Sequence, residues 1–143
     1  MTGAARALVF IVDDDVDVLE IGRMALEAGG FRVVCCGDPE EALGAMAVEA
    51  PDLVISDLVM QRLDAGFELV RRMRADQRLR SVPVLMMSGV NSQHGFNFVP
   101  RDANDLRAMQ IDGFLEKPVR GPRLVASVRE ALARRAGPTD AGA

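Results

Sequence analysis

Short apolar runs alternate along the chain with longer segments in which apolar residues recur three and four positions apart. The five runs lie at residues 8–12, 31–36, 53–56, 84–87 and 113–115. Their short length and their Val, Ile, Leu, Met and Phe content predict strands that are buried on both faces. The intervening segments predict helices. Strand and helix therefore alternate five times with short connections, which favours right-handed crossovers and a parallel sheet with helices on both faces.

Four helical faces follow from the spacing of apolar residues. They are Val18, Ile21, Gly22 and Ala25; Leu43, Met46, Ala47 and Ala50; Gly66, Leu69, Val70 and Met73; and Leu124, Val128, Ala131 and Leu132. In the stretch DPEE, Asp38 suits an N-cap, Pro39 the first helical position and Glu41 a capping box. Pro83 can open the fourth strand, where its missing N–H costs little.

The length of 143 residues is typical of one domain. We expect a folded unit over residues 7–135, between a disordered N-terminus at residues 1–6 and a disordered tail at residues 136–143. Although 49% of the residues are apolar, no uninterrupted run approaches the ~18 residues that span a bilayer. The N-terminal segment is too short, and too soon followed by aspartates, for a secretory signal. These features argue against membrane insertion and predict a cytoplasmic location.

The charge of the chain argues against a direct nucleic-acid partner. The net charge is -4 and the pI is near 5.0, whereas binding to phosphate backbones requires a basic surface. We expect the arginines clustered at positions 71, 72, 74, 78 and 80 to be solvated. Cys35 and Cys36 are adjacent and should point to opposite faces of a strand, which leaves neither a disulfide nor a metal site. The only histidine, His94, is expected in a loop.

Polar residues stand at the carboxyl ends of four predicted strands. They are Asp13 and Asp14 after the first, Ser56 and Asp57 at the third, Ser88 and Gly89 at the fourth, and Lys117 and Pro118 at the fifth. The functional crevice of an open α/β sheet lies beyond these ends, so the residues should converge. Three carboxylates suit a hard cation such as Mg²⁺, and one of them could accept a phosphoryl group as a nucleophile. The lysine would supply a positive charge and the serine a hydrogen-bond donor.

This set of motifs resembles the receiver domains of bacterial two-component response regulators, in particular the single-domain type that regulates chemotaxis. The matching stretches are VDDD at 12–15, SDLVM at 56–60, SG at 88–89 and KP at 117–118, in the family's order over about residues 7–135. The resemblance implies a flavodoxin-like, doubly wound α/β fold with five parallel strands in the order 2-1-3-4-5.

The resemblance also implies a role for each residue at the strand ends. Asp57 would be the phosphoacceptor and Lys117 would contact the phosphoryl group. Asp14 and Asp57 would bind Mg²⁺ directly, the backbone carbonyl of Val59 would be a further ligand, and Asp13 would hold metal-bound water.

Two further positions would form the switch of such a domain. Ser88 would move to bond the phosphoryl group, and Phe114 would swing inward when it does. The remaining aspartates of the first cluster, Asp15 and Asp17, are better explained as charges at a helix N-terminus.

The chain departs from the family pattern at three places. Gln61 replaces a usual proline, and LDAGFEL has one residue more than usual. The segment from Gly89 to Ile111 is longer and irregular, with a helical pattern only at residues 102–109. One hypothesis is that Phe96 and Phe98 pin this segment onto the domain and change the surface for partners; the alternative is a mobile loop.

The expected function is Mg²⁺-dependent acceptance of phosphate from a histidine kinase or phosphotransfer protein, followed by a population shift that changes protein contacts. The length leaves no room for an output domain, so the target would be a separate protein unless the chain is part of a longer one. A phosphorylation-dependent homodimer is also consistent with the resemblance. Val59 and Val90 would flank the water that hydrolyses the acyl phosphate, and neither side chain can orient it, which predicts a slow loss of phosphate.

Two other functions are compatible with parts of the sequence. An aspartyl-phosphate hydrolase of the haloacid dehalogenase type would use Asp13 or Asp15, but its D-x-D-x-T/V signature is incomplete here and there is no substrate cap. A binding module with the same fold and no control by phosphate would have no need to gather the uncompensated charges of Asp13, Asp14 and Asp57. The position of the phosphorylated aspartate distinguishes the three.

Overall fold

The computed structural model describes residues 6–58, 65–89 and 110–142. Its elements are β1 (Leu8–Val12), α1 (Val16–Ala28), β2 (Arg32–Cys36), α2 (Pro39–Val48), β3 (Leu53–Asp57), α3 (Ala65–Arg74), β4 (Val84–Gly89), β5 (Gly113–Lys117) and α5 (Gly121–Gly142). Several sequence predictions fall outside these ranges: the roles of Val59, Gln61, Val90, His94, Phe96 and Phe98, and the helical pattern at residues 102–109.

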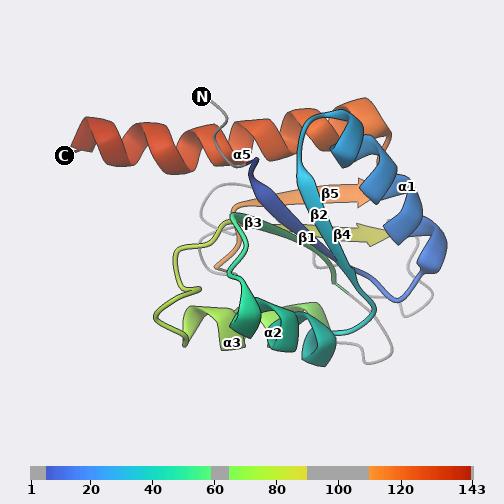
Figure 1. Cartoon of the computed structure of the whole chain (residues 1–143), viewed down its shortest axis with the longest axis horizontal. Coiled ribbons are helices and arrows are strands. Elements are labelled where there is room, and N and C mark those ends of the chain that lie inside the picture. The colour runs from blue at the N-terminus through green and yellow to red at the C-terminus, as the bar shows by residue number, and fades with distance from the viewer. Residues whose placement is uncertain (1–5, 59–64, 90–109, 143) are drawn as a thin grey trace.

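The five strands form one parallel sheet in the order β2-β1-β3-β4-β5, which confirms the predicted fold class. In register, Val12 of β1 lies beside Cys36 of β2 and Ser56 of β3. The helices α1 and α5 cover one face of the sheet, and α2 and α3 cover the other (Figure 1). Because all strands run in the same direction, their carboxyl ends lie along one edge of the sheet.

Each face of the sheet has its own hydrophobic core. Along β1 the side chains alternate: Phe10 belongs to the cluster under α2 and α3, and Ile11 belongs to the cluster under α1 and α5. All five residues of β1 are buried, as are those of β3. A strand covered on both faces has no polar side to alternate with, and this is why the sequence shows these strands as continuous apolar runs.

The N-terminal caps predicted for α1 and α2 are present, and one hydrogen bond differs from the predicted capping box. Asp38 is the N-cap of α2, and its side chain accepts a hydrogen bond from the Glu41 N–H at 2.7 Å. The Glu41 carboxylate reaches back one residue further than a standard capping box and accepts from the Gly37 N–H. At α1, Asp15 is the N-cap and accepts from the N–H groups of Asp17 and Val18. Asp15 therefore has the structural role that the sequence indicated.

The expected buried face of α1 is incorrect at one position. Gly22 is buried, whereas Ile21 is 61% exposed. The residue that completes the buried side is Leu26, which is fully buried. The physical reason is that α1 does not pack on the sheet along the whole predicted face, because a pocket described below lies between α1 and α5.

The prediction of a solvated arginine cluster is wrong for Arg74, whose side chain is only 14% exposed. Its guanidinium donates to the backbone carbonyl oxygens of Leu79, Arg80, Val82 and Gln110, with distances of 2.7 Å to Val82 and 2.9 Å to Gln110. It also lies 3.4 Å from the Asp112 carboxylate. These carbonyls belong to the turn before β4 and to the approach to β5, so Arg74 joins the segments that lead into these strands.

Two aspartates have matching positions just before strands of the sheet. Asp52, just before β3, accepts a hydrogen bond from the Leu8 N–H at 2.7 Å. Asp112, just before β5, accepts one from the Val84 N–H at 2.8 Å. Each carboxylate thus satisfies the first N–H of a neighbouring strand, which the sheet ladder leaves without a partner.

Helix α5 is longer than the sequence predicted. It runs to Gly142, through residues 136–142 for which a disordered tail was expected, and is about 33 Å long at 1.5 Å per residue. It extends past the sheet in Figure 1. None of the described helices is long and apolar enough to cross a membrane.

Candidate functional site

Three strands bring two carboxylates and one ammonium group together at the carboxyl edge of the sheet. Asp13 directly follows β1, Asp57 ends β3, and Lys117 ends β5. The Lys117 Nζ lies 2.7 Å from Asp13 Oδ2 and 3.3 Å from Asp57 Oδ2. Residues that are 44 and 60 positions away from one another in sequence therefore form one charged cluster.

The cluster is largely removed from water. Asp13 is fully buried, Asp57 is 6% exposed, and the Lys117 side chain is 23% exposed. Asp13 Oδ1 accepts a hydrogen bond from the Asp15 N–H at 2.9 Å. Its other oxygen, Oδ2, is within ion-pair distance of Lys117 but has no partner among the described residues in hydrogen-bond geometry. A buried carboxylate oxygen of this kind is available to a further cation.

Opposing influences act on the pKa of Lys117. Burial of the ammonium is the largest single influence and lowers the pKa. The short contact with the Asp13 carboxylate and the charges of Asp57 and Asp13 together outweigh burial, so the pKa of Lys117 is raised above its ordinary value. Lys117 is therefore a permanent positive charge at neutral pH. It is also the only lysine in the sequence.

The carboxylates of Asp13, Asp14 and Asp57 fit a hard metal ion. One oxygen from each lies within 4.8 Å of the others, with Asp13 and Asp57 buried and Asp14 exposed. Hard divalent cations prefer oxygen ligands, and Mg²⁺ keeps several waters, which suits a site with one side open to solvent. Among the described residues, Asp13 Oδ2 has an ion pair with Lys117 but no hydrogen bond, so it can also serve as a ligand of a metal ion.

The two predicted switch residues lie on β4, which is next to β3, and on β5, which is next to β4. Ser88 follows Met87, the residue of β4 that pairs with Asp57, and its hydroxyl donates to the Gly89 carbonyl at 3.4 Å. The structure therefore brings Ser88 to the same edge as the charged cluster. Phe114 lies in β5 three residues before Lys117, beside Met86, and is half-buried against the core under α2 and α3.

Gly66 is a residue of the site that the sequence analysis placed only on a helical face. It lies in the first turn of α3, and its N–H donates to the Leu58 carbonyl at 3.0 Å. A Cβ atom at this position would lie 2.5 Å from the Asp57 carbonyl oxygen and 2.8 Å from the Leu58 Cα. Only glycine allows α3 to approach the backbone of Asp57 so closely. The signal in the sequence is a glycine in a helix soon after the strand that ends in Asp57.

The arrangement of these groups matches one protein family along most of the chain. Residues 9–129 match the family model of the response regulator receiver domain. The chain belongs to this family. Receiver domains of response regulators are signalling domains of two-component systems, and phosphorylation on an aspartate is a property of the family.

Curated relatives of the receiver domain agree with this assignment. The chain is 32% identical over 135 residues to the response regulator Rre1 of Synechocystis, covering 94% of this chain and 55% of the relative. It is 34% identical over 124 residues to the transcriptional regulatory protein FixJ of Bradyrhizobium diazoefficiens, covering 87% and 56%. The chain thus spans about half the length of the curated relatives that it matches.

Solved structures show the same fold. The chemotaxis response regulator CheY4 of Vibrio cholerae superposes with a TM-score of 0.75 at 25% identity, covering 89% of this chain and 99% of that one. NtrX of Brucella abortus superposes with a TM-score of 0.79 at 26% identity, covering 96% of this chain and 29% of that one. The receiver fold therefore occurs both as a whole chain and as part of a longer one.

Proposed function

We propose that this receiver domain accepts a phosphoryl group on Asp57 in a Mg²⁺-dependent reaction, and that phosphorylation changes its contacts with other proteins. The observation that carries the proposal is the position of Lys117, 2.7 Å from Asp13 and 3.3 Å from Asp57. A buried lysine between two carboxylates provides a cationic place for an incoming anion beside a nucleophile.

The proposed reaction forms an acyl phosphate on Asp57. A carboxylate oxygen of Asp57 attacks the phosphorus of a phosphohistidine, the phosphorus–nitrogen bond breaks, and the imidazole leaves with the electron pair and gains a proton. Lys117 then pairs with the phosphoryl oxygens in place of one carboxylate. Without Lys117, the buried charge of Asp13 would repel the phosphoryl group.

Mg²⁺ would be held by Asp13, Asp14 and Asp57, with the Val59 carbonyl expected as a further ligand. Bound there, the cation would offset the negative charge of the phosphoryl oxygens while the phosphoryl group is transferred to Asp57. Asp14 is the exposed member of the set. Its carboxylate can therefore be replaced by water as a ligand of the cation without a change in the core.

The proposed switch uses Ser88 and Phe114. The Ser88 hydroxyl makes a long bond to a neighbouring carbonyl, so little is lost when it turns toward a phosphoryl oxygen. Phe114 is half-buried and can move further into the core. Such a change would shift the population between two conformations.

The proposed partners are proteins. A histidine kinase or phosphotransfer protein would supply the phosphoryl group, and a downstream protein or a second phosphorylated copy would recognise the switched surface. We propose no direct contact with nucleic acid, because the net charge is -4. We also propose that the domain is a cytoplasmic phosphoacceptor and catalyses only its own phosphorylation and dephosphorylation.

The test is to incubate the protein with MgCl₂ and acetyl phosphate and to locate the added phosphoryl group by mass spectrometry. We expect the label on Asp57, no label in Asp57→Asn or when a chelator replaces Mg²⁺, and normal label in Asp52→Asn. Asp52 is a matched control because it stands at the opposite end of the same strand.

The other possible functions give different outcomes in the same experiment. Label on Asp13 or Asp15 would contradict the proposal and support a hydrolase of the haloacid dehalogenase type. A folded wild-type protein that takes no label from acetyl phosphate or from a phosphorylated phosphotransfer protein would support a binding module without control by phosphate.

A further inference from the structure

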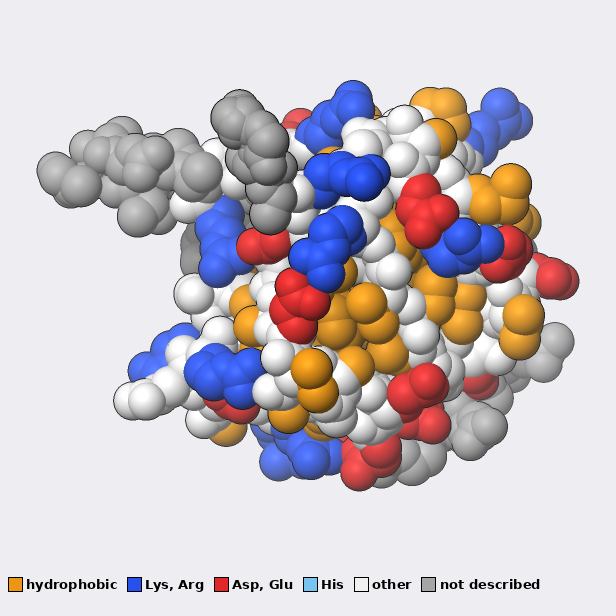
Figure 2. Space-filling view, in the orientation of Figure 1, with side chains coloured by type: hydrophobic (Ala, Val, Ile, Leu, Met, Phe, Trp, Pro, Cys, Tyr) orange, Lys and Arg blue, Asp and Glu red, His pale blue; other side chains and the backbone are white. Residues whose placement is uncertain are grey.

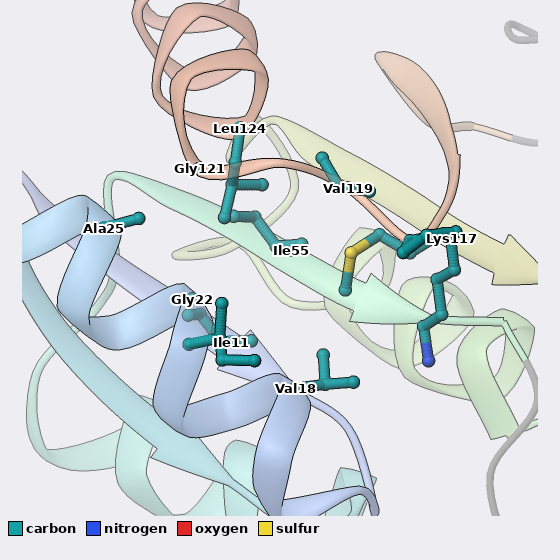
Figure 3. A pocket seen from close by; sticks show the side chains of 12 residues that line it. Ile11, Val18, Gly22, Ala25, Ile55, Lys117, Val119, Gly121 and Leu124 are labelled. Atoms are coloured by element: carbon teal, nitrogen blue, oxygen red, sulfur yellow. The ribbon is translucent and has the colours of Figure 1, made fainter.

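A pocket of about 360 Å³ lies between α1 and α5, next to the charged cluster but outside it. Its floor is formed by buried side chains of the central strands, among them Ile11, Ile55 and Met87. Figure 3 shows Val18 of α1 and Val119 of the segment before α5 on opposite sides of it, with the Lys117 side chain at one end. The pocket is therefore bounded by residues of four strands, two helices and the loop that follows β5.

Small residues explain why the space between the helices is not filled by the protein. The helices α1 and α5 come close at Ala25 and Gly121, where a Cβ on Gly121 would lie 3.2 Å from the Ala25 Cβ. Gly22 has no side chain to occupy the pocket, and a Cβ there would lie 2.9 Å from Ile11 Cδ1. Ile21, which lines the pocket from α1, is 61% exposed. Orange apolar side chains and the charged groups around them can be seen on the outer surface in Figure 2.

The lining decides the polarity of an occupant. Among the described residues that line the pocket, only Lys117 carries a charge. Its ammonium is already held by Asp13 and Asp57 at 2.7 Å and 3.3 Å. Inside the pocket, an anion would have to compete with both carboxylates for this single ammonium, whereas a cation would be buried among apolar side chains. The chemistry of the walls therefore selects a neutral apolar molecule.

The volume decides the size of an occupant. An apolar cavity of about 150 Å³ in another protein is enough to bind benzene. A pocket of about 360 Å³ has room for two fused aromatic rings with a substituent. We propose that the pocket between α1 and α5 binds a small neutral molecule with a fused aromatic ring system. This site is separate from phosphoryl acceptance on Asp57, and its test uses no phosphodonor.

The test is a titration of N-phenyl-1-naphthylamine, a neutral probe whose fluorescence rises in apolar surroundings. The chain has no Trp and no Tyr, so its own fluorescence does not overlap that of the probe. We expect a saturable increase with one site per chain, and displacement of the probe by naphthalene. No saturable increase at protein concentrations up to the millimolar range would overturn the proposal.

Single substitutions test whether the probe binds inside this pocket. Val18→Phe and Val119→Phe should each fill the pocket and weaken binding at least tenfold, with folding checked by cooperative urea unfolding. Val48→Phe is the matched control, because Val48 is 88% exposed on α2 and should leave binding unchanged. Met24→Lys distinguishes binding in the pocket from binding on the outer surface of α1, because Met24 is 59% exposed. Binding that is lost in Met24→Lys and kept in both Phe variants would overturn the proposal.

A second measurement does not depend on the variants. In wild-type protein, saturation with naphthalene should shift the NMR signals of the Ile11 and Ile55 methyl groups and of Met87, which form the floor of the pocket. The methyl group of Met46, in the core on the opposite face of the sheet, should not shift. Shifts confined to exposed methyl groups would contradict binding inside the pocket.

Discussion

The Lys117 ammonium lies 2.7 Å from a fully buried carboxylate oxygen of Asp13. That oxygen has no described hydrogen-bond partner, so the lysine is the main compensation for a charge that water does not reach. The pair joins the ends of β1 and β5, which are separated in the sheet by β3 and β4. Lys117 is thus a structural counter-charge as well as the proposed partner of the phosphoryl group.

Mg²⁺ should stabilise the folded protein through the carboxylate cluster. A ligand that binds only the native state adds about 1.4 kcal/mol to the free energy of unfolding at ten times its dissociation constant. We expect this gain in urea unfolding with MgCl₂, compared with NaCl at equal ionic strength. Asp57→Asn should reduce the gain and Asp52→Asn should keep it. A gain of equal size in both variants would mean that the ion binds elsewhere.

Gly66→Ala should destabilise the protein by about 1–3 kcal/mol, because the new Cβ would lie 2.5 Å from the Asp57 carbonyl oxygen and force α3 to move. It should also slow phosphorylation from acetyl phosphate. The matched control is Gly44→Ala in α2, where a Cβ meets nothing within 4 Å and helix propensity predicts a gain of about 0.5–1 kcal/mol. Equal effects of the two variants would show that close approach to Asp57 is unimportant.

Arg74→Met should lower the free energy of unfolding by about 2–3 kcal/mol, since the partly buried carbonyl groups of Leu79 and Val82 would lose their donor. Arg71→Met on the same helix is the comparison. The Arg71 side chain is 72% exposed and pairs with Glu68, so its loss should change stability by less than about 0.5 kcal/mol. Urea unfolding measures both; similar small losses would mean that solvent replaces the bonds of Arg74.

Stability should fall as the pH rises above 9. Burial raises the pKa of the Cys36 thiol from 9.0 to about 12, so the unfolded chain loses this proton first and unfolding becomes more favourable between these values. The expected slope is about 1.4 kcal/mol per pH unit for one proton. The pKa of Lys117 is also raised in the folded protein. The free energy of unfolding therefore falls further as the pH rises from the ordinary lysine pKa through the raised one.

The contribution of Cys36 can be isolated by substitution. Cys36→Ala should begin at lower stability because it leaves a cavity, but its decline above pH 9 should be shallower than that of the wild type. Unfolding in urea with a reductant, measured from pH 8 to pH 11, gives both slopes. Parallel curves for wild type and Cys36→Ala would exclude the buried thiol as the cause.

The lifetime of the phosphorylated form is a prediction from sequence alone. Val59 and Val90 cannot orient a water molecule through their side chains, so we expect phosphate to be lost slowly after the donor is removed. A Val59→Asn, Val90→Glu double variant should lose it faster. Equal or slower decay in the variant would mean that backbone groups already position the water.

The strands and the site aspartates could be predicted from the sequence for physical reasons. A strand buried on both faces leaves a continuous apolar run, so the run at residues 8–12 predicts β1 with the bounds Leu8–Val12 that the structure has. Asp13 and Asp57 follow such runs directly, and parallel strands bring their carboxyl ends to one edge. The local pattern therefore determined which residues meet in space.

Other features depend on contacts that no local pattern records. Arg74 looks like its neighbours in the stretch RRMR, but its partners come from a turn five to eight residues later and from Gln110. Ile21 has the spacing of a buried residue. Its exposure results from the pocket between α1 and α5, two helices that are far apart in the sequence. Gly66 fits a helical face, whereas its requirement is set by the backbone of Asp57.

Aspartates at the two edges of the sheet should be replaced by asparagine at different frequencies as copies of this gene diverge. At Asp52 a single side-chain oxygen accepts a backbone N–H, and asparagine offers the same oxygen. At Asp13 and Asp57 the negative charge itself is needed. Neutral drift can therefore exchange acid for amide at the amino edge of the sheet while selection removes the same exchange at the carboxyl edge. The frequency of asparagine at each position would separate carboxylates kept for architecture from those kept for chemistry.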